Sequence, residues 1–172
     1  MNNLHFISPE IFVSLTVMFL LILGVFIKNS SNLIHNLSMI FLFITGILIL
    51  NNPLETNITL FNGSYIIDNL SSYMKALTIL GGVVVLSISK KYLKISNIFL
   101  IEYPILILSS ILGMMVMISS NDLIVFYVGL ELQSLALYVL ASFNRDQLKS
   151  SESGLKYFVL SALSSGLLLY GC

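Results

Sequence analysis

Residues 122–143 read DLIVFYVGLELQSLALYVLASF, an apolar stretch in which Glu131 is the one charge after Asp122. A helix over 123–143 rises about 1.5 Å per residue, which places Glu131 about 13 Å from Asp122 and near the middle of a hydrocarbon layer about 30 Å thick. An unpaired carboxylate there costs about 2.5–3.5 kcal/mol, so it needs a partner, a water-filled cavity or a bound proton. The stretch predicts a membrane-spanning helix with a functional acid at its centre.

Polar side chains recur around Glu131 at helical spacing. They are four, three, four and four residues apart: Tyr127, Glu131, Ser134, Tyr138 and Ser142. Residues at these spacings share one face of a helix, and we expect that face to point toward protein or water rather than lipid. The alternative for Glu131 is a structural acid tied to a backbone or serine group.

The composition describes a polytopic membrane protein. Hydrophobic residues make up 57% of the chain and charged residues 9%, and the mean hydropathy is +0.98. The net charge of zero gives no reason to expect nucleic-acid binding, so the expected partners are other membrane proteins and lipid. The chain has a single cysteine, and neither histidine has a ligand pattern nearby, so we predict no metal and no cofactor.

Six apolar runs predict one all-α membrane domain over residues 1–172, a bundle of six transmembrane helices. Their expected ranges are about 9–27, 33–50, 69–89, 103–118, 123–143 and 153–172. Ser8 is expected to cap the first helix, with Pro9 at its first position. The polar residues 55–68 and the lysines that follow residue 89 are assigned to loops.

Basic residues orient this bundle. Six of the eight lie in the first, third and fifth predicted connections, and the second and fourth contain none: Lys28, Lys90, Lys91, Lys94, Arg145 and Lys149. Lysine and arginine gather on the inner side of a membrane, so both termini are predicted to face the outer compartment.

Three further charged residues lie at or inside the predicted helices. Lys156 begins the sixth helix and could extend to the inner interface, with Glu152 four residues before it. Lys75 could reach the outer interface near Asp68 in the same way. Glu102 precedes Pro104, where a carboxylate suits the positive end of a helix dipole. A role in proton movement is the alternative for each, with Lys75 and Glu102 the weaker candidates.

Four segments together resemble the subunit 2 family of respiratory NADH dehydrogenase, complex I, whose members are antiporter-like membrane subunits. The segments are ISPEIFVSL at 7–15, DNLSSYMKALTIL at 68–80, GMMVMISSNDLIVFYVGLELQSLALYVLASFNRD at 113–146 and SSESGLKYFVLSALSSGLLLYG at 150–171. The resemblance runs the full length and implies the first part of a fold of about fourteen helices. It also implies that Glu131 is the functional acid of the fifth helix, that Lys156 is the lysine at the head of the next, and that Glu102 matches a recurrent acid before the fourth.

The family's central lysines lie on later helices, beyond these segments. The resemblance implies that those lysines hold and pass protons and that Glu131 tunes the first of them, because a carboxylate nearby favours the charged form of a lysine. We therefore expect a separate chain carrying the C-terminal half of the subunit, among other membrane-arm subunits of complex I. Electron transfer from NADH to ubiquinone is assigned to the rest of that complex, since no dinucleotide-binding loop is present.

Two other functions remain open: half of an Mrp-type cation/proton antiporter, and a structural or assembly subunit without a proton path. Ile, Asn, Ser, Phe and Tyr are plentiful, and lysine outnumbers arginine seven to one. Such usage is typical of an AT-rich genome and suggests an organelle-encoded chain in the mitochondrial inner membrane. No basic region precedes the first apolar run, which is expected to be a mature helix.

Overall fold

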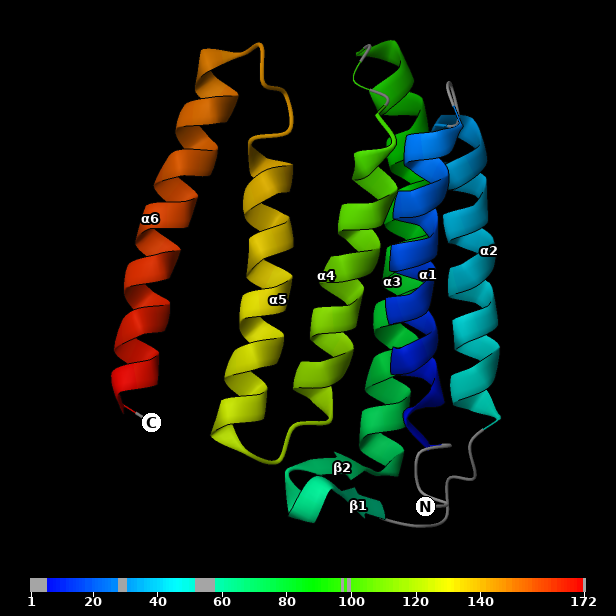
Figure 1. Cartoon of the computed structure of the whole chain (residues 1–172), viewed down its shortest axis with the longest axis vertical. Coiled ribbons are helices and arrows are strands. Elements are labelled where there is room, and N and C mark those ends of the chain that lie inside the picture. The colour runs from blue at the N-terminus through cyan, green and yellow to red at the C-terminus, as the bar shows by residue number, and fades with distance from the viewer. Residues whose placement is uncertain (1–5, 28–30, 52–57, 97, 99, 172) are drawn as a thin grey trace.

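The computed structural model describes residues 6–27, 31–51, 58–96, 98 and 100–171. Within these ranges it contains six α-helices and one small antiparallel hairpin. The helices are α1 (Ser8–Phe26), α2 (Ser31–Leu50), α3 (Asn69–Ile95), α4 (Glu102–Ile118), α5 (Leu123–Ala141) and α6 (Leu148–Gly171). Figure 1 shows them running side by side, with the hairpin lying across one end and the end of α6 at that same side.

Four helices are long and apolar enough to cross a membrane: α1, α2, α3 and α5. Helix α4 is equally apolar but has 17 residues. Helix α6 begins with a polar stretch, LKSSESG, before its apolar part. The all-helical membrane fold that the sequence predicts is confirmed in this coarser form, with six helices of which four satisfy both criteria.

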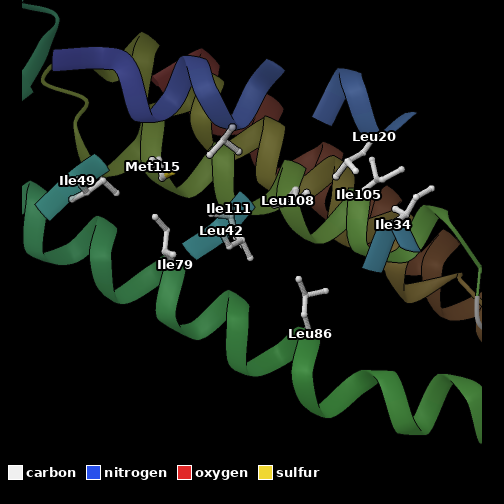
Figure 2. Packing of buried hydrophobic residues seen from close by; sticks show 11 residues of the cluster. Leu20, Ile34, Leu42, Ile49, Ile79, Leu86, Ile105, Leu108, Ile111 and Met115 are labelled. Carbon is white, nitrogen blue, oxygen red and sulfur yellow. The ribbon is translucent and has the colours of Figure 1, made fainter. Parts of the chain in front are cut away.

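The hydrophobic core lies among the first four helices. Its fully buried side chains come from each of them, as Leu20 on α1, Leu42 on α2, Leu86 on α3 and Leu108 on α4 illustrate. Figure 2 shows these residues converging between the ribbons. Helix α5 packs on α4 from outside this core, and α6 packs chiefly on α5. The two helices that carry Glu131 and Lys156 are therefore the peripheral pair at the left of Figure 1.

A β-hairpin occupies part of the segment that the sequence assigns to a polar loop. Strands β1 (Ile58–Leu60) and β2 (Tyr65–Ile67) pair antiparallel, with Ile58 opposite Ile67. A 3-10 turn, η2 (Phe61–Gly63), joins them through three residues with positive φ. The loop prediction was wrong here because β-branched and aromatic residues alternate on both sides of an Asn-Gly pair, which is a hairpin pattern.

The hairpin is tied to the connection between α4 and α5. The amide of Ile66 donates to the carbonyl of Ser119 over 2.8 Å, and the amide of Asn121 donates to the carbonyl of Ser64 over 3.0 Å. The side-chain amide of Asn121 also donates to the carbonyl of Gly63 over 2.7 Å. These bonds fix the hairpin beneath the helix bundle.

Several predicted helix ends are displaced. Helix α3 continues to Ile95, so Lys90, Lys91 and Lys94 lie in its last turns rather than in a loop. Helix α6 begins at Leu148, five residues before the predicted position, because polar residues extend the helix beyond its apolar part. Ser8 does not cap α1: the N-cap is Ile7, so Ser8 is the first residue of the helix and Pro9 the second, not the first as predicted.

Candidate functional site

The polar stripe of α5 turns partly toward α6. Tyr138 is buried, its hydroxyl donates to Ser161 Oγ over 2.6 Å, and its ring packs edge-on against Tyr157 and Phe158. The hydroxyl of Ser134 donates to the carbonyl of Leu130 within its own helix, over 2.6 Å. The expectation that this stripe faces protein is confirmed for Ser134 and Tyr138, which are both buried.

Glu131 lies on the same face without an ion-pair partner among the described residues. It is half-buried, and its Oε1 atom is buried with no hydrogen-bond partner in the part of the chain that the structure describes. Its backbone carbonyl accepts from Ser134 Oγ, but no serine hydroxyl reaches its carboxylate. A bound proton, a water molecule or a cation would satisfy this buried oxygen.

Close packing of α4 against α5 positions Glu131. A Cβ placed on Gly113 would lie 2.6 Å from the backbone nitrogen of Gln133, and one on Gly129 would lie 2.8 Å from that of Met117. The two helices can approach this closely because neither glycine carries a side chain. The acid is thereby held two residues from a backbone-to-backbone contact.

Lys156 is exposed and pairs with Glu152 over 2.6 Å, one turn earlier on α6. Because α6 begins at Leu148, Lys156 lies about 12 Å along the helix rather than near its start. Glu131 is about 15 Å from Ala141, the last residue of α5, so the two residues lie at similar distances along their helices. The ion pairs among the described residues do not include one between Glu131 and Lys156.

Glu102 is the first residue of α4, as the dipole argument expected. Its carboxylate contacts Arg145 over 3.4 Å, with both side chains more than half exposed. This contact links the start of α4 to the connection between α5 and α6. A pair so open to solvent contributes little stability.

Lys75 does not extend to the interface: it is 3% exposed and pairs with Glu10 of α1, Nζ to Oε1, over 2.5 Å. Tyr65 of β2 joins them, because its hydroxyl donates to Glu10 Oε1 over 2.9 Å and accepts from Lys75 Nζ over 3.3 Å. The ammonium also lies 5.2 Å from the centre of the Tyr65 ring. Three elements thus meet in one buried polar cluster.

Tyr65 is held neutral in this cluster. Burial raises the pKa of its hydroxyl far above the ordinary value of 10.0, and the negative charge of Glu10 raises it further. The hydroxyl is therefore able to donate and accept hydrogen bonds at any physiological pH. Its hydrogen bonds to both charges are those of a neutral phenol.

Sequence reasoning missed Glu10, although one signal was available. Glu10 follows Pro9 in the first turn of an apolar helix, where an acid reads as a dipole partner. A second reading was possible because Lys75 also lies inside an apolar run and both lie near the same predicted membrane face. The described residues contain no group of three His, Cys, Asp or Glu side chains arranged to hold a metal.

Comparison with known proteins finds relatives in sequence and in fold. The family model described as "NADH:quinone oxidoreductase/Mrp antiporter, TM" matches residues 120–172, which contain Glu131 and Lys156. The NADH-quinone oxidoreductase subunit N of Pelagibacter ubique is 80% identical over 172 residues, covering 100% of this chain and 36% of the relative. The subunit N of Rhodospirillum rubrum is 50% identical over 165 residues, covering 95% of this chain and 34% of the relative.

A solved structure has the same fold. A chain of respiratory complex I from Thermus thermophilus with bound aureothin superimposes with a TM-score of 0.79. The match is 24% identical and covers 95% of this chain and 35% of that chain. The fold and the matched segment define an antiporter-like helical membrane protein.

Over almost its whole length the chain is similar to part of the NADH-quinone oxidoreductase subunit N of these bacteria. It spans about a third of the length of the curated relatives it matches. Those relatives are bacterial.

Proposed function

We propose that this chain is part of a proton-translocating membrane-arm subunit of NADH:quinone oxidoreductase. The observation that carries the proposal is Glu131, a half-buried acid within an apolar helix, whose Oε1 has no partner among the described residues. Identity of 80% over the whole chain to a subunit N supports the assignment to this enzyme. The chain itself performs no redox chemistry and holds no cofactor in this proposal.

Glu131 acts in this proposal by Coulomb attraction on a lysine that lies outside the described helices. A carboxylate beside a buried lysine favours the protonated lysine, and a change in their separation reverses that preference. Such a pair loads and releases one proton when the surrounding helices move. Lys156, and more weakly Glu102, would extend the path toward the inner face.

The partner of Glu131 belongs in this proposal to the part of the subunit that corresponds to the remaining two thirds of the relatives. Helix α6 is almost wholly exposed, with only Gly154 and Ser165 buried. The exposed apolar side chains of α6 and the part of the α5 stripe that α6 does not contact are expected to pack against further helices or lipid. We propose that those helices pack against α5 and α6 within the membrane arm.

The membrane is the energy-coupling membrane that contains this enzyme. The sequence suggested a mitochondrial inner membrane and an organelle gene on the basis of AT-rich residue usage. We prefer a bacterial cytoplasmic membrane, because the relatives compared with this chain are bacterial. For either membrane we propose six transmembrane helices, with both termini toward the outer compartment.

Replacement of Glu131 by Gln tests this function. In the intact enzyme reconstituted into liposomes, Glu131→Gln is expected to reduce the protons moved per NADH oxidised, because the amide cannot attract a lysine proton. Asp146→Asn is the matched control, since Asp146 is an exposed acid in the connection before α6. It should leave the ratio unchanged.

An assembled Glu131→Gln enzyme that pumps at the control level would refute the role of Glu131. Pumping that continues without NADH oxidation but depends on a Na⁺ gradient would instead favour an Mrp-type antiporter. The family model that matches residues 120–172 includes both kinds of protein.

A further inference from the structure

We propose that Glu10, Tyr65 and Lys75 form a second proton-exchange site, at the opposite end of the bundle from the basic helix ends. The site would take a proton from, or give one to, water in the hollow beside Glu10. The inference rests on the proposed function, because it assigns a further step to the same proton movement. It is separate from the α5 stripe, since its residues come from α1, β2 and α3.

The first observation is the triangle of polar atoms. Nζ of Lys75 lies 2.5 Å from Oε1 of Glu10, and the Tyr65 hydroxyl bridges them at 3.3 and 2.9 Å. A proton can leave Nζ for the tyrosine oxygen while the tyrosine proton passes to Oε1. That double shift breaks one N–H and one O–H bond, forms two O–H bonds, and converts the ion pair into a neutral amine and acid.

The second observation is the unsatisfied oxygen of Glu10. The residue is 5% exposed, and its Oε2 has no hydrogen-bond partner among the described residues. A purely structural ion pair is expected to satisfy both carboxylate oxygens. A bound proton or a water molecule buried beside it would satisfy this oxygen.

The third observation is a hollow of about 460 Å³ beside this acid. It is bounded by the hairpin and by α1, α4 and α5, with these residues among its lining: Ile7, Glu10, Phe61, Tyr65, Val116 and Val125. Apart from the lining by Glu10 and Tyr65, the walls are mostly apolar. Glu10, whose Oε1 contacts Lys75, therefore forms part of the wall of this hollow.

Among the described acids at this end of the bundle, Glu10 is the one that pairs with Lys75. Asp68 accepts from the amide of Ser71 over 2.7 Å and caps α3. Asp122 caps α5 by accepting from the amide of Ile124 over 3.4 Å. No basic side chain other than Lys75 contacts Glu10 among the described residues. A proton on Glu10 removes the one counter-charge that the described residues give Lys75, and so favours the neutral amine that the double shift leaves.

Tyr65→Phe tests the site with the least structural change, because it removes one oxygen and keeps the ion pair. In the intact reconstituted enzyme we expect fewer protons moved per NADH oxidised, with assembly and NADH oxidation retained. Tyr73→Phe is the matched control, because Tyr73 is an exposed tyrosine of α3, 61% exposed. The double variant Glu10→Gln with Lys75→Gln, which leaves no unpaired charge, should show the same loss. The single variant Glu10→Asp, which keeps the carboxylate, should retain part of the native ratio of protons moved per NADH oxidised.

A normal proton-to-NADH ratio in assembled Tyr65→Phe enzyme would overturn the inference and leave a structural cluster. If Glu131→Gln reduces pumping while Tyr65→Phe does not, the proposed function survives and this site does not. If neither variant changes pumping, both proposals fail. A reduced ratio in Tyr65→Phe alone supports this site and removes the role of Glu131.

Discussion

At the scale of single residues, exposure separates three ion pairs of similar chemistry. Lys75 and Glu10 are 4% and 6% exposed in their side chains, whereas Lys156 and Glu152 are 68% and 63% exposed. Removal of one partner of a buried pair leaves a charge that water cannot solvate, which costs about 3–5 kcal/mol. Exposed pairs contribute about 0–1 kcal/mol.

Lys75→Met is therefore expected to destabilise the fold by several times more than Lys156→Met, by about 3–5 kcal/mol against about 0–1 kcal/mol. The measurement is the loss of helical circular dichroism in a denaturant titration of the detergent-solubilised protein. Glu10→Leu combined with Lys75→Met should recover most of the stability, because no buried charge remains. Equal losses in the two single variants would contradict the buried-pair argument.

At the scale of secondary-structure elements, the contact between α4 and α5 depends on two glycines. Gly113 and Gly129 face backbone atoms of the opposite helix at distances that exclude a Cβ. Such a contact has no flexible side chain that could move aside. An added methyl group must therefore separate the helices.

Gly113→Ala and Gly129→Ala are each expected to lower stability by about 1–3 kcal/mol through overpacking. Gly129→Ala should also lower pumping, since Glu131 follows two residues later. Gly166→Ala on α6 is the control, because nothing lies within 4 Å of a Cβ there. Denaturant titration of the three variants checks the order, and an unchanged midpoint in Gly113→Ala would exclude close helix contact.

Helix existence at this scale could be predicted from apolar runs, and helix ends could not. The lysines at 90, 91 and 94 interrupt the apolar pattern but are good helix formers, so α3 continues through them. Residues 148–152 extend α6 for the same reason. Hydropathy indicates where a membrane span lies, whereas hydrogen bonding decides where the helix stops.

At the scale of the whole molecule, the basic residues of the third and fifth predicted connections lie toward one side of the bundle. The ends of α3 and α5 that precede the basic connections lie at one side of the bundle, and the hairpin lies at the other (Figure 1). The described part of the hairpin and of the turn between α4 and α5 contains no Lys or Arg. Positive charges favour the inner side, so we propose that the hairpin faces outward.

Single cysteines test this orientation in the chain after replacement of its one native cysteine, Cys172→Ser. Asn121→Cys, at the exposed turn beside the hairpin, should react with a membrane-impermeant maleimide added outside. Asp146→Cys should react only after the membrane is opened. The reverse labelling pattern would show that the proposed orientation is wrong and that the Glu10 site lies on the inner side.

Much of this protein follows from the sequence alone. Composition and apolar length determine a helical membrane domain, and the basic connections determine its predicted direction. Glu131 is recognisable because an acid at that depth in an apolar run is costly wherever the helix packs. Each of these properties depends on local residues and on the membrane, so no tertiary contact is needed to derive them.

Only the tertiary structure decided which charges meet. Lys75 and Lys156 look alike in sequence, yet one is buried against Glu10 and the other is exposed beside Glu152. Glu10 and Lys75 are 65 positions apart, and Tyr65 reaches them from a hairpin that the sequence assigned to a loop. A charge in an apolar helix has a known cost, but its partner depends on which helix faces turn toward one another, and that is a property of packing.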